Sequence, residues 1–231
     1  LESTVYPGAT NEIIINSLKK RFRIGKNFFV AYSPEREDPG NKTFSSKNVT
    51  KLVSGQSKYC LELVRELYSK VFKNIWSMKN IETCEMTKLY ENIYRSVNIG
   101  MVNEMKILCN KMNLNIYDII KAAKTKPFGF HPFYPGPGLG GHCIPIDPLF
   151  LTWIAKKYNA KTKFISLSDE IKMKMPNDIF ENLLKLKKSL KFKKVHIWGV
   201  AYKKNIDDIR ESPSIELIRK ILDQDEKFSR L

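Results

Sequence analysis

The sequence predicts an α/β protein built around one long helix, and three observations support this fold class. Residues 28–77 alternate between short apolar runs, typical of strands, and one amphipathic run, typical of a helix. Residues 82–112 carry apolar side chains at helical spacing. Residues 194–199 form another strand-like run before a second helical pattern. We therefore expect a parallel sheet, a helical region and the start of a second α/β unit.

The first region is expected to begin with a helix and to continue into a sheet. Thr10 or Asn11 can cap that helix. Strands are expected at residues 28–32, around Leu52 up to Gly55, and at residues 74–77, with an amphipathic helix at residues 61–72 before the last of them. Strands that alternate with a helix in this way favour parallel pairing.

The long helix places a cation beside an amide. Lys88 and Asn92 are four residues apart, so their side chains project from the same face of the helix. The apolar stripe that runs from Met86 to Met112 lies on another face. A cation and an amide side by side suit the binding of a substrate oxyanion, although many such pairs are simply solvated.

A glycine-rich segment at residues 136–148 contains one cysteine. Its four glycines and three prolines predict an irregular loop with no helix or strand. The spacing G-x-G-x-x-G occurs here, but the prolines before it exclude a central strand, so we reject a dinucleotide-binding turn. Cys143 could act as a nucleophile, and Asp147 could orient a water molecule or a lysine. The alternative is a structural loop with an inert thiol.

The remaining elements are mostly helical in pattern. Helices are expected at residues 115–124, 148–158 and 168–190, and Pro176 should kink or break the last one. Residues 194–199 are expected to form a strand. Ser212 can then cap a helix that has Pro213 at its first position.

Composition limits the class of protein. The net charge of the 231-residue chain is +16, which permits nucleic-acid binding, but the lysines are dispersed and no basic run lies beside stacking aromatics. Attraction for an anionic diphosphate explains the charge as well, so no nucleic acid is expected. The chain has no apolar run of roughly 18 residues, so no membrane span is expected.

The four cysteines argue against a metal site and against a disulfide framework. They are widely spaced and none forms C-x-x-C; they are Cys60, Cys84, Cys109 and Cys143. Reduced thiols in the cytoplasm are the simplest interpretation.

The segment YPGPGLGGHCIPIDP at residues 134–148 resembles the catalytic-cysteine segment of the nucleotide-sugar 6-dehydrogenases, the UDP-glucose/GDP-mannose dehydrogenase family. Together with LTW at residues 151–153, it most resembles the branch that acts on UDP-N-acetylglucosamine. The resemblance implies NAD as cofactor, a UDP-sugar as substrate, and oxidation of its C6 alcohol to a carboxylate in polysaccharide biosynthesis. It implies two hydride transfers, with Cys143 forming a thiohemiacetal and then a thioester.

Other motifs extend the resemblance and imply further catalytic residues. LESTVYPG at residues 1–8 and YSPER at residues 32–36 resemble motifs near the end of the family's NAD domain, which implies that Thr4 and Glu35 reach the active site. Glu35 would activate the hydrolytic water and Thr4 would position it. EMTKLYEN at residues 85–92 resembles the family's central helix, whose lysine and asparagine bind substrate and assist the chemistry.

Residues for substrate and cofactor binding follow from the same resemblance. Tyr134, Gly140 and Lys203 would bind the UDP-sugar, while Arg210 would contact NAD, as would Thr4. Where related enzymes usually carry an asparagine, this chain has Lys172, so substrate contacts near it are expected to differ.

The resemblance also implies a domain order. Residues 1–79 would be the C-terminal part of an NAD-binding domain, residues 80–190 a central catalytic and dimerisation domain, and residues 191–231 the start of a UDP-binding domain. Both ends are expected to be truncated, and the long helix is expected to mediate a homodimer. The alternative function is an inactive UDP-sugar-binding or dimerising remnant, since no glycine-rich phosphate turn follows a strand.

Overall fold

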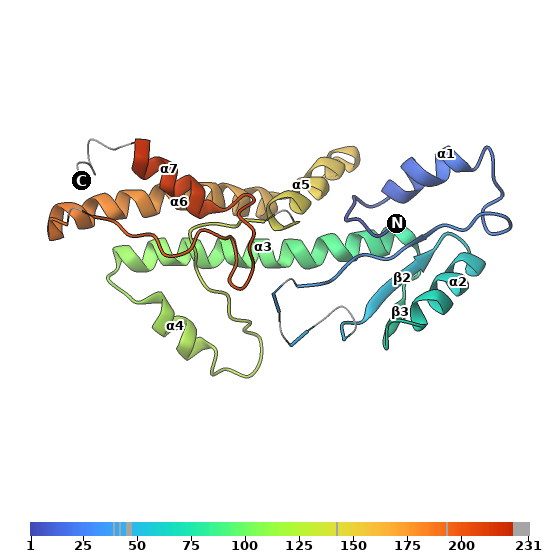
Figure 1. Cartoon of the computed structure of the whole chain (residues 1–231), viewed down its shortest axis with the longest axis horizontal. Coiled ribbons are helices and arrows are strands. Elements are labelled where there is room, and N and C mark those ends of the chain that lie inside the picture. Colours follow the sequence, from blue (N-terminus) through green and yellow to red (C-terminus); the bar gives the residue numbers. More distant parts are fainter. Residues whose placement is uncertain (39, 42, 45–47, 142, 193, 224–231) are drawn as a thin grey trace. The chain divides into compact units, whose positions relative to one another are not determined.

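A computed structural model describes residues 1–38, 40–41, 43–44, 48–141, 143–192 and 194–223, apart from the Cys143 side chain (Figure 1). The chain divides into two compact units. Unit 1 comprises Leu1–Ile93 and Asp147–Lys161, and unit 2 comprises Tyr94–Ile146 and Thr162–Leu231. We describe each unit by itself.

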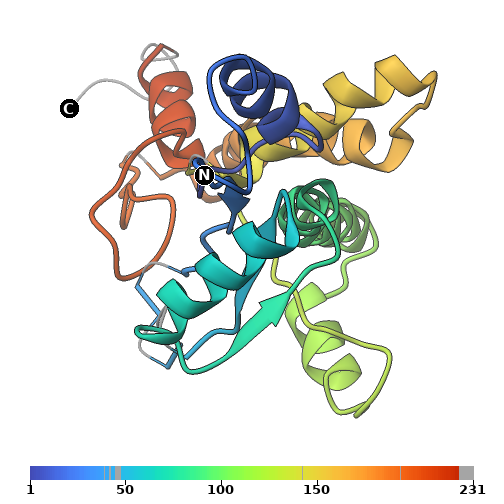
Figure 2. The same ribbon diagram turned by 90° about the vertical axis from the view of Figure 1, so that its right-hand side faces the viewer.

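Unit 1 contains a three-stranded sheet in the order β1-β2-β3. The strands are β1 (Ala31–Tyr32), β2 (Lys51–Gly55) and β3 (Ile75–Ser77). Helix α2 (Lys58–Ser69) connects β2 to β3 and packs against both (Figure 2). It begins at an N-cap, where the Ser57 side chain accepts a hydrogen bond from the backbone N–H of Cys60. This strand–helix–strand unit confirms the predicted alternation.

The prediction of a fully parallel sheet was wrong for one of the two strand pairs. β2 and β3 are parallel, with Lys51 opposite Ile75, whereas β1 and β2 are antiparallel, with Ala31 opposite Gly55. Parallel neighbours need a crossover of a dozen or more residues, usually a helix. The described residues between β1 and β2 form no helix, and this connection returns the chain in the opposite direction.

The N-terminal helix forms as expected, but its predicted cap was wrong. A π-helical turn (Thr10–Ile15) leads into α1 (Asn16–Leu18), and the cap residue is Ala9, which makes no side-chain cap bond. The side chains of Thr10 and Asn11 hydrogen-bond instead to carboxylates of α3. Tertiary contacts therefore take up the side chains that local pattern assigned to capping.

The core of unit 1 joins the sheet to the first turn of α3. Its buried members are Ile15, Val30, Tyr32, Leu52, Ile81 and Cys84. Tyr32 is fully buried, and its hydroxyl has no hydrogen-bond partner among the described residues. This unpaired hydroxyl is unusual, because most buried polar groups are hydrogen-bonded.

Helix α3 (Ile81–Lys111) confirms the predicted long helix. Its residues up to Ile93 belong to unit 1, and the rest belong to unit 2. In unit 2, helix α4 (Ile116–Ala123) packs on α3 through a cluster of Val102, Cys109, Ile116 and Ile120. Two methionines in the second half of α3, Met101 and Met105, have exposed side chains.

Helix α5 (Cys143–Ala155) corrects the prediction of an irregular segment at residues 136–148. The helix starts at the cysteine, so Pro145 lies in its first turn, where a missing N–H removes no intrahelical bond. Pro148 lies one turn further in and is tolerated near this end. A 3-10 turn (Lys156–Tyr158) follows α5.

Helices α6 (Lys163–Leu190) and α7 (Pro213–Asp223) lie side by side in unit 2 (Figure 1). Helix α6 continues through Pro176, so the expected break does not occur. Helix α7 begins at Pro213, as predicted.

The predicted strand at residues 194–199 was wrong. The described residues there have no regular structure, and the Trp198 side chain is 94% exposed. A strand needs a neighbour to accept its backbone hydrogen bonds, and none of the described strands pairs with this segment. Within the described part of the chain, no helix is both long and apolar enough to cross a membrane.

Candidate active site

Unit 1 brings together two of the predicted site residues. Asn92 on α3 donates a hydrogen bond from its Nδ2 to the Oδ2 of Asp147 on α5, over 2.6 Å. Both side chains are buried, with 8% and 3% exposure. A hydrogen bond between residues 55 positions apart, in a buried setting, fixes the orientation of the carboxylate.

Lys88 lies one turn before Asn92 on α3 and is half-buried. It makes no hydrogen bond or ion pair with the described residues of unit 1, so its ammonium group can donate to a ligand. Asp147 accepts its hydrogen bond from Asn92, which lies one turn further along α3 than Lys88. Amide and carboxylate form the pair, and the cation lies on the same helix face.

Glu35 and Thr4 lie on irregular segments of unit 1. Thr4 is half-buried. Glu35 is about half exposed; its Oε1 accepts the N–H groups of Arg36 and Glu37, and its Oε2 pairs with Lys51 Nζ at 3.2 Å. The structure therefore holds this carboxylate in a turn while leaving it open to water.

Sequence reasoning missed Arg36, which ties this turn to α3. Its guanidinium forms a bidentate pair with Glu91, at 2.6 and 3.2 Å, and also donates to the carbonyl of Thr50. Two parallel bonds from arginine to a carboxylate fix orientation as well as distance. In the sequence, only the position of Arg36 directly after Glu35 indicates that it could anchor this turn.

Burial controls the electrostatics of unit 1. It raises the pKa of the Cys84 thiol to about 11, so this cysteine is protonated at neutral pH and is a poor nucleophile. Burial also raises the pKa of the Tyr32 hydroxyl and of the Glu85 carboxyl. Hydrogen bonds from Thr10 and Gly8 partly offset the shift at Glu85.

In unit 2 the glycine-rich loop packs against the segment before α7. The N–H of Gly141 donates to the carbonyl of Arg210 at 3.0 Å, and the N–H of Gly136 donates to the side-chain oxygen of Asn103 at 2.9 Å. A Cβ atom at Gly140 would come within 2.8 Å of the Glu211 carbonyl and would also collide with Tyr202. Only glycine allows this close approach.

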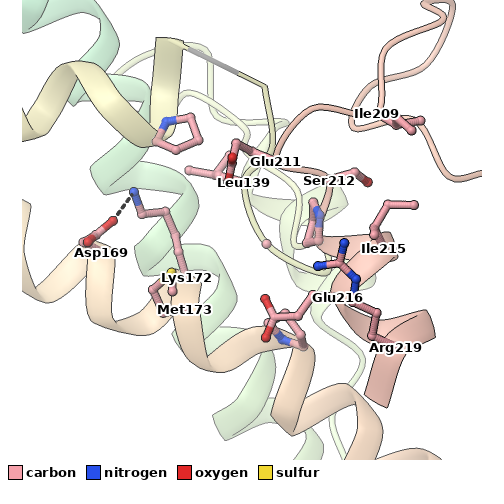
Figure 3. A pocket seen from close by; sticks show the side chains of 14 residues that line it. Leu139, Asp169, Lys172, Met173, Ile209, Glu211, Ser212, Ile215, Glu216 and Arg219 are labelled. Carbon is pink, nitrogen blue, oxygen red and sulfur yellow. Dashed lines mark ion pairs between the residues drawn. The ribbon is translucent and has the colours of Figure 1, made fainter. Parts of the chain in front are cut away.

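The same segments enclose a pocket of about 490 Å³ (Figure 3). The glycine-rich loop, two turns of α6 and the start of α7 form its walls, and the lining includes Leu139, Lys172, Pro213 and Arg219. Lys172 is 6% exposed; its Nζ pairs with Asp169 at 3.0 Å and donates to Ser96 at 3.2 Å. The residue that departs from the family pattern thus contributes a buried cation to this pocket.

The other predicted residues of unit 2 are more open. Tyr134 is 54% exposed and Lys203 is half-buried; neither lines the pocket just described. Arg210 is bound to Asp208 in a bidentate contact, with Nη2 at 2.6 Å from Oδ2. This hydrogen bond lowers the pKa of Asp208. The side chain of Cys143, the predicted nucleophile, lies outside the described part of the structure.

Groups that could hold a cofactor or metal are few among the described residues. No cluster of three histidine, cysteine or acidic side chains there could hold a metal ion. For NAD, β2 ends at Gly55 shortly before the N-terminus of α2, which is where α/β proteins place phosphate groups. Arg210 is exposed, and its guanidinium could exchange Asp208 for a pyrophosphate. Within unit 1, the junction of β2 and α2 therefore suits a phosphate group.

Comparison with known proteins covers most of the chain. Sequence models of the UDP-glucose/GDP-mannose dehydrogenase family match residues 1–72 as its NAD binding domain, residues 82–173 as its central domain and residues 196–229 as its UDP binding domain.

Individual relatives agree with these matches. UDP-N-acetyl-D-mannosamine dehydrogenase of Methanocaldococcus jannaschii is 35% identical over 224 residues, covering 97% of this chain and 50% of that protein. UDP-N-acetyl-D-glucosamine 6-dehydrogenase of Pseudomonas aeruginosa is 34% identical over 227 residues, covering 95% of this chain and 53% of that protein. The solved structure of UDP-D-ManNAc dehydrogenase from Pyrococcus horikoshii superposes with a TM-score of 0.84 at 31% identity, covering 96% of this chain and 53% of that one.

The fold and the three matches in this order define the class of nucleotide-sugar dehydrogenases. The chain belongs to the UDP-glucose/GDP-mannose dehydrogenase family. It spans about half the length of the curated relatives that it matches.

Proposed function

We propose that this chain carries out, or forms part of, the NAD-dependent oxidation of C6 of a UDP-sugar to the uronic acid in polysaccharide biosynthesis. The observation that carries the proposal is the buried Asn92–Asp147 hydrogen bond, with Lys88 one turn away on the same helix. All three residues lie within the match to the central domain of the family. A buried carboxylate held by an amide, beside an available cation, suits chemistry at an alcohol oxygen.

The substrate we propose is a UDP-linked N-acetylhexosamine. Two relatives are named for UDP-N-acetylmannosamine and UDP-N-acetylglucosamine, which share the UDP and acetamido groups. The segment at residues 134–153 favours UDP-N-acetylglucosamine.

The proposed reaction uses one site twice. The alcohol at C6 loses a hydride and a proton and becomes an aldehyde, and NAD, when bound, supplies the hydride acceptor. The Cys143 thiol then adds across the aldehyde, with its sulfur bonding to the carbon and its proton passing to the oxygen. The thiohemiacetal loses its hydroxyl proton and a second hydride, which a second NAD would accept, and becomes a thioester. Water cleaves the thioester, releasing the carboxylate and the thiol.

Each predicted residue has a role in this scheme. Lys88 stabilises the oxyanion. Asp147 accepts a hydrogen bond from Asn92 and so orients the Asn92 amide, one turn from Lys88 on α3. Glu35, which is open to water, activates the hydrolytic water, and Thr4 positions it.

Ligand-binding roles fall to residues of unit 2. Tyr134, Gly140 and Lys203 bind the UDP-sugar, and Arg210 contacts the pyrophosphate of NAD.

We propose a homodimer that forms through α3, supported by the exposed apolar side chains on its second half, which are Met101, Met105, Leu108 and Met112. We also propose the three-part division at residues 1–79, 80–190 and 191–231, supported by the order of the family matches.

The test is NADH formation by the 231-residue chain with NAD and each of three sugars: UDP-N-acetylglucosamine, UDP-N-acetylmannosamine and UDP-glucose. We expect NADH with an acetamido sugar, none with Cys143→Ala, and normal rates with Cys109→Ala, which removes a different thiol. NADH formation by Cys143→Ala would refute the thioester route. No NADH, with a UDP-sugar still bound in calorimetry, would favour a UDP-sugar-binding remnant, and no binding either would refute the proposal.

A further inference from the structure

A buried carboxylate on α3 holds the N-terminal loop of unit 1. Glu85 is 0% exposed. Its Oε2 accepts the N–H of Gly8 at 2.6 Å, while its Oε1 accepts both the N–H of Thr10 at 2.9 Å and the Thr10 hydroxyl at 2.6 Å. Three donors from one short loop therefore converge on a single side chain 75 or more positions away.

The geometry of these contacts depends on the backbone of the loop. Gly8 has a φ of +94°, a conformation that residues with a Cβ atom rarely adopt. This conformation allows the Gly8 N–H to meet the carboxylate while the next residues enter the first helical turn. Hydrogen bonds from neutral donors to a carboxylate are shorter and stronger than those between neutral groups.

The same loop also contacts α5 through Tyr6, and Lys157 of the turn after α5 lies beside this contact. The ring of Tyr6 lies 5.0 Å from that of Trp153, and Lys157 Nζ lies 4.8 Å from the Trp153 ring. Lys157 also pairs with Glu12 at 3.3 Å. The loop thus contacts both α3, which carries Lys88, and α5, which carries Asp147.

Glu85 shares a helix face with the residues proposed to act on substrate. Lys88 is three positions further on and Asn92 is seven, which is close to two full turns. A loop fixed by Glu85 therefore lies against the part of α3 that presents those two side chains. Thr4 lies four residues before Gly8 on that loop.

We propose that Glu85 is a positioning residue: it fixes the loop of residues 4–10 on α3, so that Thr4 keeps a constant place relative to Lys88 and Asn92. This inference rests on the proposed function for its catalytic consequence. Glu85 is not proposed to touch substrate, since its hydrogen bonds among the described residues all go to the loop. A buried carboxylate is a costly way to pack a loop, because apolar residues would fill the same space without desolvating a charge. The directional hydrogen bonds are what an apolar contact would lack.

The test measures the loop and the reaction separately, with Glu85→Gln as the main variant. Glutamine keeps the shape but replaces one acceptor oxygen with a donor, so one loop N–H loses its partner. The matched control is Glu104→Gln, an exposed carboxylate on the same helix. Thr10→Val removes only the hydroxyl donor, and serves if Glu85→Gln does not fold.

Hydrogen exchange of the amides of Gly8 and Thr10 reports the state of the loop without any substrate. We expect exchange in residues 4–10 to rise by about tenfold or more in Glu85→Gln, to rise less in Thr10→Val, and to stay unchanged in Glu104→Gln. Unchanged exchange in Glu85→Gln and Thr10→Val would overturn the proposed anchor, whatever the enzyme activity.

Steady-state kinetics then test the positioning role. With a misplaced Thr4, we expect Glu85→Gln to lower kcat while the KM for the UDP-sugar changes little, because Thr4 is assigned to the hydrolytic water and not to sugar binding. Faster exchange with unchanged kcat would overturn the positioning role. If the wild-type chain forms no NADH but still binds a UDP-sugar, the catalytic link to Glu85 is refuted; if it does neither, the proposed function is refuted as well. In both cases a faster exchange in Glu85→Gln leaves the anchor of the loop in place.

Discussion

One asparagine–aspartate pair from each unit, with the same donor and acceptor atoms, can be compared directly. In unit 1, Asn92 Nδ2 donates to Asp147 Oδ2 at 2.6 Å in a buried setting. In unit 2, Asn115 Nδ2 donates to Asp118 Oδ2 at 2.9 Å in an exposed setting, across three positions at the start of α4. The chemistry of the two pairs is identical, so any difference in their importance comes from burial and from what each pair connects.

The exposed pair belongs to a helix cap. The side chain of Asn115 also accepts the N–H of Tyr117, so the contact completes a local motif that water could replace. The buried pair joins α3 to α5, which are far apart in sequence, and water is excluded from it. We therefore expect changes at Asp147 to alter function and stability strongly, and the same changes at Asp118 to alter them little.

The largest expected difference concerns the reaction. Asp147→Asn keeps an acceptor oxygen for Asn92 but removes the charge, so the fold should persist while the rate of NADH formation falls roughly 100-fold. Asp118→Asn should change that rate by less than about twofold, because it lies on an exposed cap. Equal rates for the two variants would show that the buried carboxylate has no role in the chemistry.

The next difference concerns the free energy of unfolding. Asp147→Ala leaves the buried Asn92 amide without its acceptor, which should lower the free energy of unfolding by about 1–3 kcal/mol. Asp118→Ala should lower it by at most about 1 kcal/mol, since exposed polar contacts contribute little. Urea denaturation of both variants gives the comparison, and a larger loss at Asp118 would contradict the importance assigned to burial.

The pH dependence of stability should reveal the buried Glu85. Burial raises its folded-state pKa above the unfolded value of about 4.5, and the nearby Glu82 charge raises it further, against the lowering effect of hydrogen bonds from Thr10 and Gly8. A raised pKa contributes stability that is fully present below the unfolded pKa and is lost as pH rises through the folded pKa. The Tm of the wild type minus that of Glu85→Gln should therefore decrease as pH rises from 4.5, and an increasing difference would contradict the direction of the shift.

The smallest expected effect is at Tyr32. Its buried hydroxyl has no partner among the described residues, so Tyr32→Phe removes a desolvated polar group without breaking a hydrogen bond. The free energy of unfolding should stay constant or rise by up to about 1 kcal/mol. A fall in the free energy of unfolding by more than about 1 kcal/mol would mean that the hydroxyl has a partner in solution, such as an ordered water.

Features with a regular local period were predictable from sequence. Helix α3 repeats apolar residues over its full length, and the strands that α2 connects have clear apolar runs and turn residues, so their existence and type were confirmed. Helix α4 begins after Asn115, as its capping residue indicates.

Features that depend on distant partners were not predictable. The antiparallel β1, the unformed strand at residues 194–199 and the helix that starts at Cys143 all depend on neighbours or on exact position within a turn. The contacts within the candidate site were likewise only partly predictable from the sequence. The face shared by Lys88 and Asn92 follows from helical spacing, whereas the pairing of Asn92 with Asp147 and the contacts of Glu85 depend on which helices pack together.

We propose a double oxidation at one site, and the number of NADH molecules formed per UDP-sugar measures it directly. With the sugar limiting and NAD in excess, we expect two NADH for each UDP-N-acetylhexosamine consumed and the uronic acid as product. One NADH per sugar, with an aldehyde or another product, would contradict the cysteine-linked second step.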